Sequence, residues 1–208
     1  MTDATAQRIN ACLESLKLEP LDDITAEQFA AYLSLFIRWN ERLNLTSVRT
    51  ESGIISRHLA ESIACARAIP KGVATLLDFG SGAGLPGIPI ALCRPEIAVT
   101  LAESQSKKAA FLQEAVRQLA IPIKVYSGRA EALSEAFDCV VMRAVDKMPK
   151  AVTVATTLMG PQGWIGLMTT NEDLVHLCAV TGAEFLWSPP IDLPSASERI
   201  VAFGRKLS

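Results

Sequence analysis

The sequence predicts an α/β fold with a Rossmann-like, mostly parallel sheet, an antiparallel edge strand and an N-terminal helical extension. Three observations support this fold. The first 70 residues show only helical patterns, short apolar runs alternate with helical patterns after Pro70 and Gly72, and a glycine-rich turn follows the first of these runs. Strands that alternate with helices form a parallel sheet covered on both faces, and ligands bind beyond the carboxyl ends of its strands.

Two apolar stripes predict helices within residues 1–70. Thr25 and Gln28 form a capping box ahead of the first stripe, which predicts a helix that begins at Thr25. Helical spacing relates the members of each stripe. The first stripe contains Phe29, Leu33, Phe36, Ile37 and Leu43, and the second contains Ile55, Leu59, Ser62, Ile63 and Ala66.

Seven short apolar runs predict strands in the rest of the chain. They are Thr75–Phe79, Ala98–Glu103, Ile123–Ser127, Asp138–Arg143, Trp164–Met168, Phe185–Ser188 and Ile200–Arg205. Helices are expected between the first five runs, with the clearest apolar face at Leu112, Ala115, Val116 and Leu119 and further helices at 151–158 and 171–180. Only the stretch "PPIDLPSASE", residues 189–198, separates the last two strands, so we expect them to pair antiparallel at one edge.

Length and composition indicate an ordinary globular protein. The chain has 208 residues, of which 50% are hydrophobic and 20% are charged, a balance that excludes a disordered chain. We divide it into a helical extension at residues 1–70 and a second part at residues 71–208, and expect the two to form one compact, monomeric unit. The five cysteines lie far apart without a C-x-x-C pair, which fits reduced, mostly buried thiols better than a disulfide framework or a zinc site, so no metal is expected.

Charge and hydropathy limit the cellular setting and the partners. No uncharged apolar run reaches the length of about 18 residues that a membrane helix needs, and the N-terminus is polar, so we expect a cytoplasmic protein with neither a membrane span nor a signal peptide. The net charge is −2, and the isoelectric point is near 5.8. Nucleic-acid-binding proteins usually carry a basic excess, so any contact with RNA must come from local basic patches.

The stretch "LLDFGSGAGLPGIPI", residues 76–90, predicts a nucleoside-binding turn between the first strand and its helix. Gly80, Gly82 and Gly84 alternate at the point where a ligand must approach backbone amides. The spacing G-x-G-x-G differs from the dinucleotide fingerprint and lacks a P-loop lysine, which favours a cofactor other than NAD or ATP. Glu103 ends the second strand about 20 residues further on, where a carboxylate accepts hydrogen bonds from ribose hydroxyls.

These residues resemble a known family. The motif D-x-G-S-G-A-G-L-P-G-I-P and the upstream "WNERLNLTSVRTESGIISRHLAESI" are similar to the RsmG (GidB) family of bacterial methyltransferases that act on small-subunit ribosomal RNA. The likeness runs from about Phe36 to Val145 and weakens after that. It implies a class I methyltransferase fold, S-adenosylmethionine as the cofactor, and methylation of N7 of one guanine in 16S rRNA.

The resemblance also implies a cofactor site. By matching motifs, it comprises Gly80, Leu85, the Ala130 and Glu131 pair after the third strand, and Arg143 after the fourth. Gly80 and Gly82 would let the backbone approach the methionine moiety, Glu103 would hold the ribose, and Ala130 and Glu131 would lie beside the adenine. A guanidinium such as that of Arg143 also binds a phosphate, a carboxylate or a guanine edge, so Arg143 is in addition the candidate for positioning the substrate.

Methyl transfer to N7 of guanine requires little acid–base machinery. N7 carries a lone pair and no proton, so the enzyme mainly holds the nucleophile in line with the methyl group and excludes water. No cysteine follows a proline, as is familiar in methylation of base carbons. The stretch after the fourth strand reads "MRAVDKMP" rather than Asn or Asp followed by Pro-Pro and an aromatic residue, the pattern of amine methylation.

Two locally basic groups are candidates for RNA contact. The first contains Arg38, Arg42, Arg49, Arg57 and His58, of which Arg57 and His58 match the family's "RH" motif. The second contains Lys107, Lys108, Arg129, Arg143, Lys147 and Lys150, mostly after strand ends. The chain departs from the family after the fifth strand, where Thr169 and Thr170 stand in the place of a common Lys-Gly.

Three other functions stay open from the sequence. The acidic isoelectric point and the missing lysine also fit a class I methyltransferase that acts on a small molecule or a protein. A non-catalytic ribosome-assembly factor of the same fold, or a nicotinamide-dependent oxidoreductase, would use a similar turn. For the leading function the expected partner is 16S rRNA within the small ribosomal subunit or an assembly intermediate, whose own proteins would supply part of the docking surface.

Overall fold

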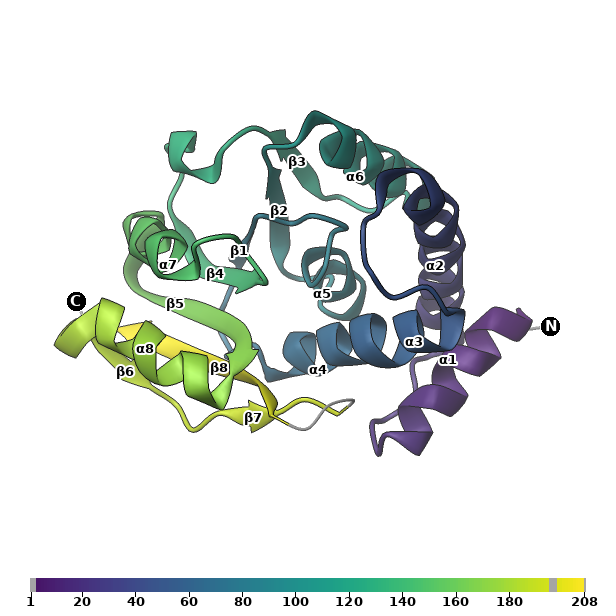
Figure 1. Ribbon diagram of the computed structural model, residues 1–208, viewed down its shortest axis with the longest axis horizontal. Coiled ribbons are helices and arrows are strands. Elements are labelled where there is room, and N and C mark those ends of the chain that lie inside the picture. Colours follow the sequence, from purple (N-terminus) through teal and green to yellow (C-terminus); the bar gives the residue numbers. More distant parts are fainter. Residues whose placement is uncertain (1–2, 195–197, 208) are drawn as a thin grey trace.

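The computed structural model describes residues 3–194 and 198–207 and has the expected α/β architecture (Figure 1). An eight-stranded sheet has the strand order β3-β2-β1-β4-β5-β8-β6, and the short β7 pairs with β8. The strands are β1 Thr75–Phe79, β2 Ala98–Glu103, β3 Lys124–Ser127, β4 Phe137–Arg143, β5 Met159–Thr170, β6 Phe185–Trp187, β7 Ile191–Asp192 and β8 Arg199–Lys206. Neighbours from β3 to β5 are parallel, whereas β8 is antiparallel to β5, β6 and β7.

The helices fill the segments that the sequence indicated. They are α1 Ala4–Ser15, α2 Asp23–Leu43, α3 Glu51–Ile54, α4 Ala60–Ala68, α5 Gly87–Cys93, α6 Ser106–Leu119, α7 Met148–Thr157 and α8 Asn171–Thr181. A π-helical turn, Ile55–Leu59, joins α3 to α4. No helix in the described part of the chain is long and apolar enough to cross a membrane.

The alternation of side chains along the strands divides the core into two layers. Leu76, Cys139 and Val141 point to one face, where they pack with buried side chains of α1, α2, α4, α5 and α6. Leu77, Val140 and Met142 point to the other face and pack with α7 and α8. Figure 1 shows α2 and α6 on one side of the sheet and α7 and α8 on the other. The N-terminal helices therefore cover one face of the sheet.

The structure corrects three details of the sequence prediction. The fifth strand, predicted at Trp164–Met168, is β5 Met159–Thr170 and so extends further at both ends. The helix predicted from Thr25 begins at Asp23, because Asp22 is its N-cap and accepts a 3.0 Å hydrogen bond from the Thr25 amide. The capping-box prediction was therefore wrong about the capping residue. The stretch 189–198 contains strand β7 rather than a plain connection, and its residues 195–197 lie outside the described residues.

The antiparallel pairing predicted for the last two strands of the sequence analysis is confirmed. Phe185 to Trp187 of β6 pair with Lys206 to Gly204 of β8. The same β8 also pairs along its length with β5, so it lies between β5 and β6 in the sheet. Strands β2, β1 and β4 are neighbours in the sheet, and the glycine-rich turn emerges at their carboxyl ends.

Candidate functional site

The glycine-rich loop after β1 has a backbone that favours glycine. Gly80, Gly82 and Gly84 have φ angles of 71°, 55° and 80°, in the left-handed region that side chains with a Cβ avoid. A Cβ on Gly84 would lie 2.6 Å from Cδ1 of Ile88, so the first turn of α5 closes directly over this position. The alternate glycines thus allow a tight loop that turns back on itself, in which the Gly84 and Leu85 amides donate to the Ser81 carbonyl.

Hydrogen bonds to two elements, β2 and α2, hold this loop in place. The amides of Gly80 and Ser81 both donate to the Ala102 carbonyl of β2 at 3.0 Å. The buried hydroxyl of Tyr32, which belongs to α2, donates to the Ala83 carbonyl at 2.5 Å. The second contact joins the N-terminal helices to the loop, so the loop conformation depends on both parts of the chain.

Asp78 is a buried carboxyl group under the loop that the sequence reading did not single out. Its Oδ2 accepts a 3.0 Å hydrogen bond from the Gly87 amide at the start of α5, and the residue is 1% exposed. Burial raises the pKa of Asp78 to about 7. A Cβ on Gly87 would lie 2.6 Å from this oxygen, so the glycine permits the close approach of helix and strand. The available signal was an ionisable residue inside the apolar run "TLLDF".

Glu103 ends β2 beside the loop, as predicted, and its carboxylate organises the backbone there. One oxygen accepts from the Gly82 amide at 2.8 Å, and the other accepts from the Gln105 amide at 2.7 Å. Each carboxylate oxygen has more than one lone pair, so these bonds leave acceptor capacity for a further donor. Glu103 is mostly buried, and the same residue lines the open space beyond the loop.

That space, which we call the loop hollow, has a volume of about 460 Å³. It lies between the glycine loop, the end of β2 and the segment after β4. Seven of the residues predicted from the sequence line it: Gly80, Gly82, Leu85, Glu103, Lys108, Arg143 and His58. The structure therefore brings most of the predicted cofactor residues to one place, at the carboxyl ends of the parallel strands.

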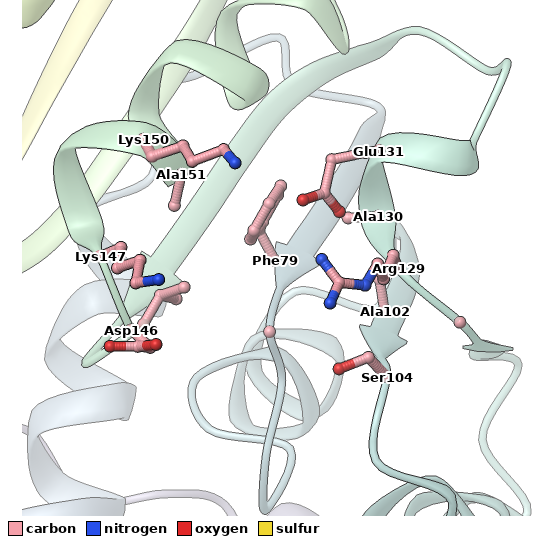
Figure 2. Close-up of a pocket in the computed structure, with 13 residues that line it drawn as sticks. Phe79, Ala102, Ser104, Arg129, Ala130, Glu131, Asp146, Lys147, Lys150 and Ala151 are labelled. Atoms are coloured by element: carbon pink, nitrogen blue, oxygen red, sulfur yellow. The ribbon is translucent and has the colours of Figure 1, made fainter.

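A second space, the rim hollow, adjoins the first and has a volume of about 310 Å³. The two share Gly80, Ser104, Val145 and Asp146 in their walls. Ala130 and Glu131 follow β3 on one side of the rim hollow, and Lys147 and Lys150 lie on the other side (Figure 2). The two hollows therefore adjoin at the carboxyl ends of β1, β2 and β4, and we refer to them together as the cleft.

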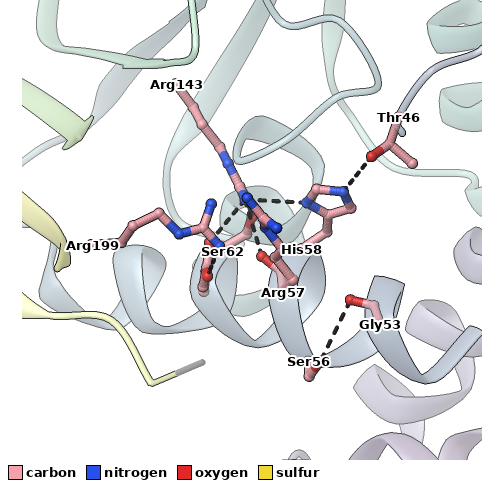
Figure 3. A network of polar contacts seen from close by, with 9 residues as sticks. Thr46, Gly53, Ser56, Arg57, His58, Ser62, Arg143 and Arg199 are labelled. Atoms are coloured by element: carbon pink, nitrogen blue, oxygen red, sulfur yellow. Dashed lines mark hydrogen bonds and ion pairs between the residues drawn. The ribbon is translucent and has the colours of Figure 1, made fainter. Parts of the chain in front are cut away.

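Arg143, at the end of β4, extends to the helical segment that carries Arg57, His58 and Ser62 (Figure 3). Its Nη2 donates to Oε2 of Glu61 at 2.8 Å and to the Arg57 carbonyl at 3.0 Å, and its Nη1 donates to the Ser62 hydroxyl at 3.3 Å. Only 11% of the Arg143 side chain is exposed. The pKa of Arg143 is lowered by burial, an effect that the Glu61 carboxylate opposes.

His58 is a neutral imidazole in this arrangement. Burial is the main cause that lowers the pKa of His58 to about 3, and the nearby Arg143 guanidinium lowers it further. Its Nδ1 lies 3.1 Å from Nη2 of Arg143, and because an arginine only donates, Nδ1 is the acceptor. The proton is therefore on Nε2, which donates to the Thr46 hydroxyl at 2.7 Å.

A third space, the β5 hollow, lies on the far side of Arg143 and has a volume of about 300 Å³. It shares Arg143, Ala144 and Val145 with the loop hollow. Thr169 and Thr170, which follow the fifth strand of the sequence prediction, line it together with Met148. Arg143 is thus a wall between two spaces at the ends of β4 and β5.

The remaining predicted residues do not all lie at this cleft, since Arg38 and Arg42 line a separate space beside Trp39. Arg57 has an exposed side chain that lines neither the loop hollow nor the rim hollow, and its carbonyl is what contacts Arg143. Lys147 is exposed at the start of α7. Besides Asp78, the sequence reading missed Glu61, because its two arginine partners are 82 and 138 residues away in the chain.

A family model and individual relatives of this chain point to the same protein family. A family model described as "GidB: rRNA small subunit methyltransferase G" matches residues 25–180. The protein named Ribosomal RNA small subunit methyltransferase G from Xanthomonas oryzae pv. oryzae (strain MAFF 311018) is 42% identical over 168 residues, which cover 78% of each chain. The protein of the same name from Xylella fastidiosa (strain 9a5c) shows the same identity and coverage.

Solved structures share the fold at low sequence identity. A SAM dependent methyltransferase from Aquifex aeolicus has a TM-score of 0.59 at 10% identity, covering 85% of this chain and 98% of that chain. A predicted O-methyltransferase from Agrobacterium tumefaciens has a TM-score of 0.59 at 18% identity, covering 72% of this chain and 81% of that chain. The predicted fold class, a Rossmann-like class I methyltransferase fold with an N-terminal helical extension, is confirmed.

Proposed function

The chain belongs to the GidB family of rRNA small subunit methyltransferase G proteins, and on that premise we propose that it methylates N7 of a guanine in 16S rRNA with S-adenosylmethionine as the methyl donor. The observation that carries the cofactor proposal is the loop hollow, in which bare glycine backbone and the Glu103 carboxylate face one space. A nucleoside with an attached amino acid needs both features, since its amino-acid part must approach the backbone closely and its ribose hydroxyls need an acceptor.

The residues of the cleft fit this cofactor. A Cβ on Gly80 would approach Cγ2 of Val145 to 3.2 Å, so a side chain there would narrow the passage between the loop and rim hollows. We assign Gly80, Gly82 and Leu85 to the methionine part of the cofactor. Glu103 accepts from the ribose hydroxyls with the lone pairs that its two backbone bonds leave over.

The rim hollow is assigned to the adenine. Ala130 is buried and has a side chain too small to fill the space, while Glu131 is exposed at its edge. The cofactor supplies an electrophilic methyl group when it is bound. The chain's own part in the reaction is to hold the guanine in line with that methyl group and to exclude water, because N7 has no proton to remove.

Substrate RNA is assigned to the surface beside Arg143. Arg57 and Lys147 carry exposed charges on two sides of the cleft and are proposed to contact phosphates. A neutral imidazole adds no charge for phosphate binding. We therefore propose that His58 affects RNA binding through its hydrogen bond with Arg143. Arg143 is proposed to position the guanine, and also to contact the cofactor from the wall of the loop hollow. The partner is a small ribosomal subunit or an assembly intermediate, bound by a monomer of this chain.

Mapping of rRNA methylation by mass spectrometry tests this function. Small-subunit rRNA from a strain that lacks this protein should contain one fewer N7-methylguanosine than rRNA from the parent strain. Adding the purified chain and S-adenosylmethionine to the unmethylated subunits should restore that nucleoside. Identical N7-methylguanosine content in both strains would refute the proposal and leave methylation of another substrate as the alternative.

We further propose that residues 1–70 and 71–208 fold as one unit. The buried side chains of α2 and α4 belong to the same apolar cluster as Leu76, Val99 and Val141 of the sheet. A chain that begins at residue 71 should therefore expose this face and fail to unfold cooperatively in urea. A cooperative transition in that shortened chain would contradict the proposal.

A further inference from the structure

The helical extension contributes a buried charge next to the proposed active site. Glu61 lies in α4, between the buried residues Ala60 and Ser62, and its side chain is 1% exposed. An ionised side chain is costly to bury unless charged or polar partners surround it. A carboxylate at this position therefore needs an explanation in terms of its contacts.

Two arginines from the sheet surround the Glu61 carboxylate. Oε2 accepts from Nη2 of Arg143 at 2.8 Å, and Oε1 accepts from Nη2 of Arg199. Arg143 ends β4 and Arg199 begins β8, two strands that β5 separates in the sheet. The single carboxylate thus joins one helix to two strands that do not pair with each other. Figure 3 shows the two guanidinium groups side by side above α4.

The surroundings fix Arg143 more closely than an ordinary surface arginine. Besides Glu61, its guanidinium donates to the Arg57 carbonyl, the Ser62 hydroxyl and Nδ1 of His58. All four partners come from residues 57–62, one stretch of the helical extension. Because these residues hold its guanidinium, Arg143 keeps its place in the wall that separates the loop hollow from the β5 hollow.

The charge balance of this group also depends on Glu61. Arg143 and Arg199 each carry one positive charge and Glu61 carries one negative charge, while His58 is neutral. Without the carboxylate, two guanidinium groups would face each other in a mostly buried place. Arg143 would then be driven away from Arg199, and the wall between the two hollows would move.

We propose that Glu61 is a positioning residue for the methyl transfer, which acts by holding the Arg143 guanidinium at the boundary of the loop hollow and the β5 hollow. The proposal rests on the proposed function for the identity of the reaction. It makes the helical extension part of the catalytic arrangement, through a residue that lines the β5 hollow but neither the loop hollow nor the rim hollow. A displacement of about 1 Å in a positioning group can lower a rate about 100-fold.

A double-mutant comparison tests this role with the full chain, S-adenosylmethionine and unmethylated small ribosomal subunits. The variants are Glu61→Gln, Arg143→Lys and the two combined. Glu61→Gln should lower kcat/KM about 100-fold, and the combined variant should lose no more than about twofold beyond Arg143→Lys alone, because both changes remove the same placed group. Glu51→Gln is the matched control, since Glu51 pairs with Arg8 in an exposed part of the same extension.

Three outcomes would overturn the proposal. The first is kcat/KM of Glu61→Gln within about threefold of the wild type and of Glu51→Gln. The second is multiplication of the two losses in the combined variant. The third applies if Glu61→Gln unfolds at the assay temperature: Glu61→Gln with Arg199→Met removes one anion and one cation together, and this pair should stay far less active than Arg199→Met alone. Equal activity of those two would show that Glu61 only balances charge.

A failure of the proposed function would look different. In that case the wild type itself would not methylate the subunits. Calorimetric titration with S-adenosylmethionine would still test Glu61, because Glu61→Gln and Arg143→Lys should weaken cofactor binding by a similar factor. Unchanged cofactor affinity in Glu61→Gln, beside a weakened Arg143→Lys, would contradict the positioning role.

Discussion

Replacing Asp78 by Asn should change how the stability of the protein depends on pH. Asp78 is buried under the glycine loop, and burial raises its pKa from the usual 3.8 to about 7, with a smaller rise from the nearby Glu103 carboxylate. The folded state therefore keeps a proton on Asp78 between about pH 4 and pH 7, where the unfolded chain has lost it. Stability is highest below that range and falls as the pH rises through it. Asn cannot ionise and should not show this fall.

The size of the effect follows from the two pKa values. A difference of about three pKa units, from 3.8 to about 7, corresponds to roughly 4 kcal/mol of unfolding free energy, all of it lost once the pH is well above 7. About 2 kcal/mol of this loss falls between about pH 5.5 and about pH 8. His58 acts in the opposite direction, because its pKa is lowered to about 3 and its stabilising contribution grows as the pH rises towards 6.5.

Urea unfolding of the wild type and of Asp78→Asn at about pH 5.5 and about pH 8 separates the contribution of Asp78 from that of His58. His58 is present in both proteins, so its contribution cancels in the difference between them. Relative to the wild type, Asp78→Asn should be more stable at the higher pH than at the lower pH by about 2 kcal/mol. Asn keeps an oxygen that can accept from the Gly87 amide, so the loop itself should be preserved. A difference that does not change with pH would show that Asp78 is already ionised in the folded protein.

Three further predictions concern the loop, the ribose contact and the RNA surface. Gly84→Ala should lower the melting temperature more than Gly72→Ala, because both positions have positive φ angles but only Gly84 has atoms within 3 Å of an added Cβ; equal shifts would contradict the role of packing. Glu103→Gln should weaken S-adenosylmethionine binding about tenfold in calorimetry, since an amide cannot accept from both backbone amides; unchanged affinity would remove Glu103 from the site. Arg57→Ala should raise KM for ribosomal subunits and reduce its salt dependence, whereas Arg205→Ala, on β8 at the opposite end of the sheet, should not; equal effects would contradict a local RNA contact.

Most of the fold follows from local patterns in the sequence. Thr75–Phe79 and Ala98–Glu103 are strands with the predicted bounds, since each is a short apolar run between turn residues. The errors arise where the deciding contact is a side chain near a boundary. Asp22 competes with Thr25 for the cap of α2, and both residue types are good N-caps. β7 is a strand of two residues, too short for an alternating pattern to show.

The candidate site divides in the same way. Gly80 follows β1 and Glu103 ends β2, and these strands pair in parallel, so strand order alone brings the two residues to one edge of the sheet. Glu61 could not be found by this reasoning, because its partners lie in β4 and β8 and depend on how α4 packs against the sheet. Asp78 could be found only as a charge in an apolar strand, and its environment becomes clear when α5 is in place over it.

Under the proposed function, the boundary near residue 70 does not separate a catalytic part of the chain from an accessory part. The helical extension supplies the hydroxyl of Tyr32 to the glycine loop, and it supplies Glu61 and His58 to Arg143. These three side chains are buried or half-buried, so they act by fixing groups that line the cleft. An in-line displacement without a general base requires a rigid glycine loop and a fixed Arg143 guanidinium, because its rate depends on the alignment of the reacting groups. For this reason, changes in buried polar residues of the extension should alter turnover at least as much as changes at exposed residues of the cleft.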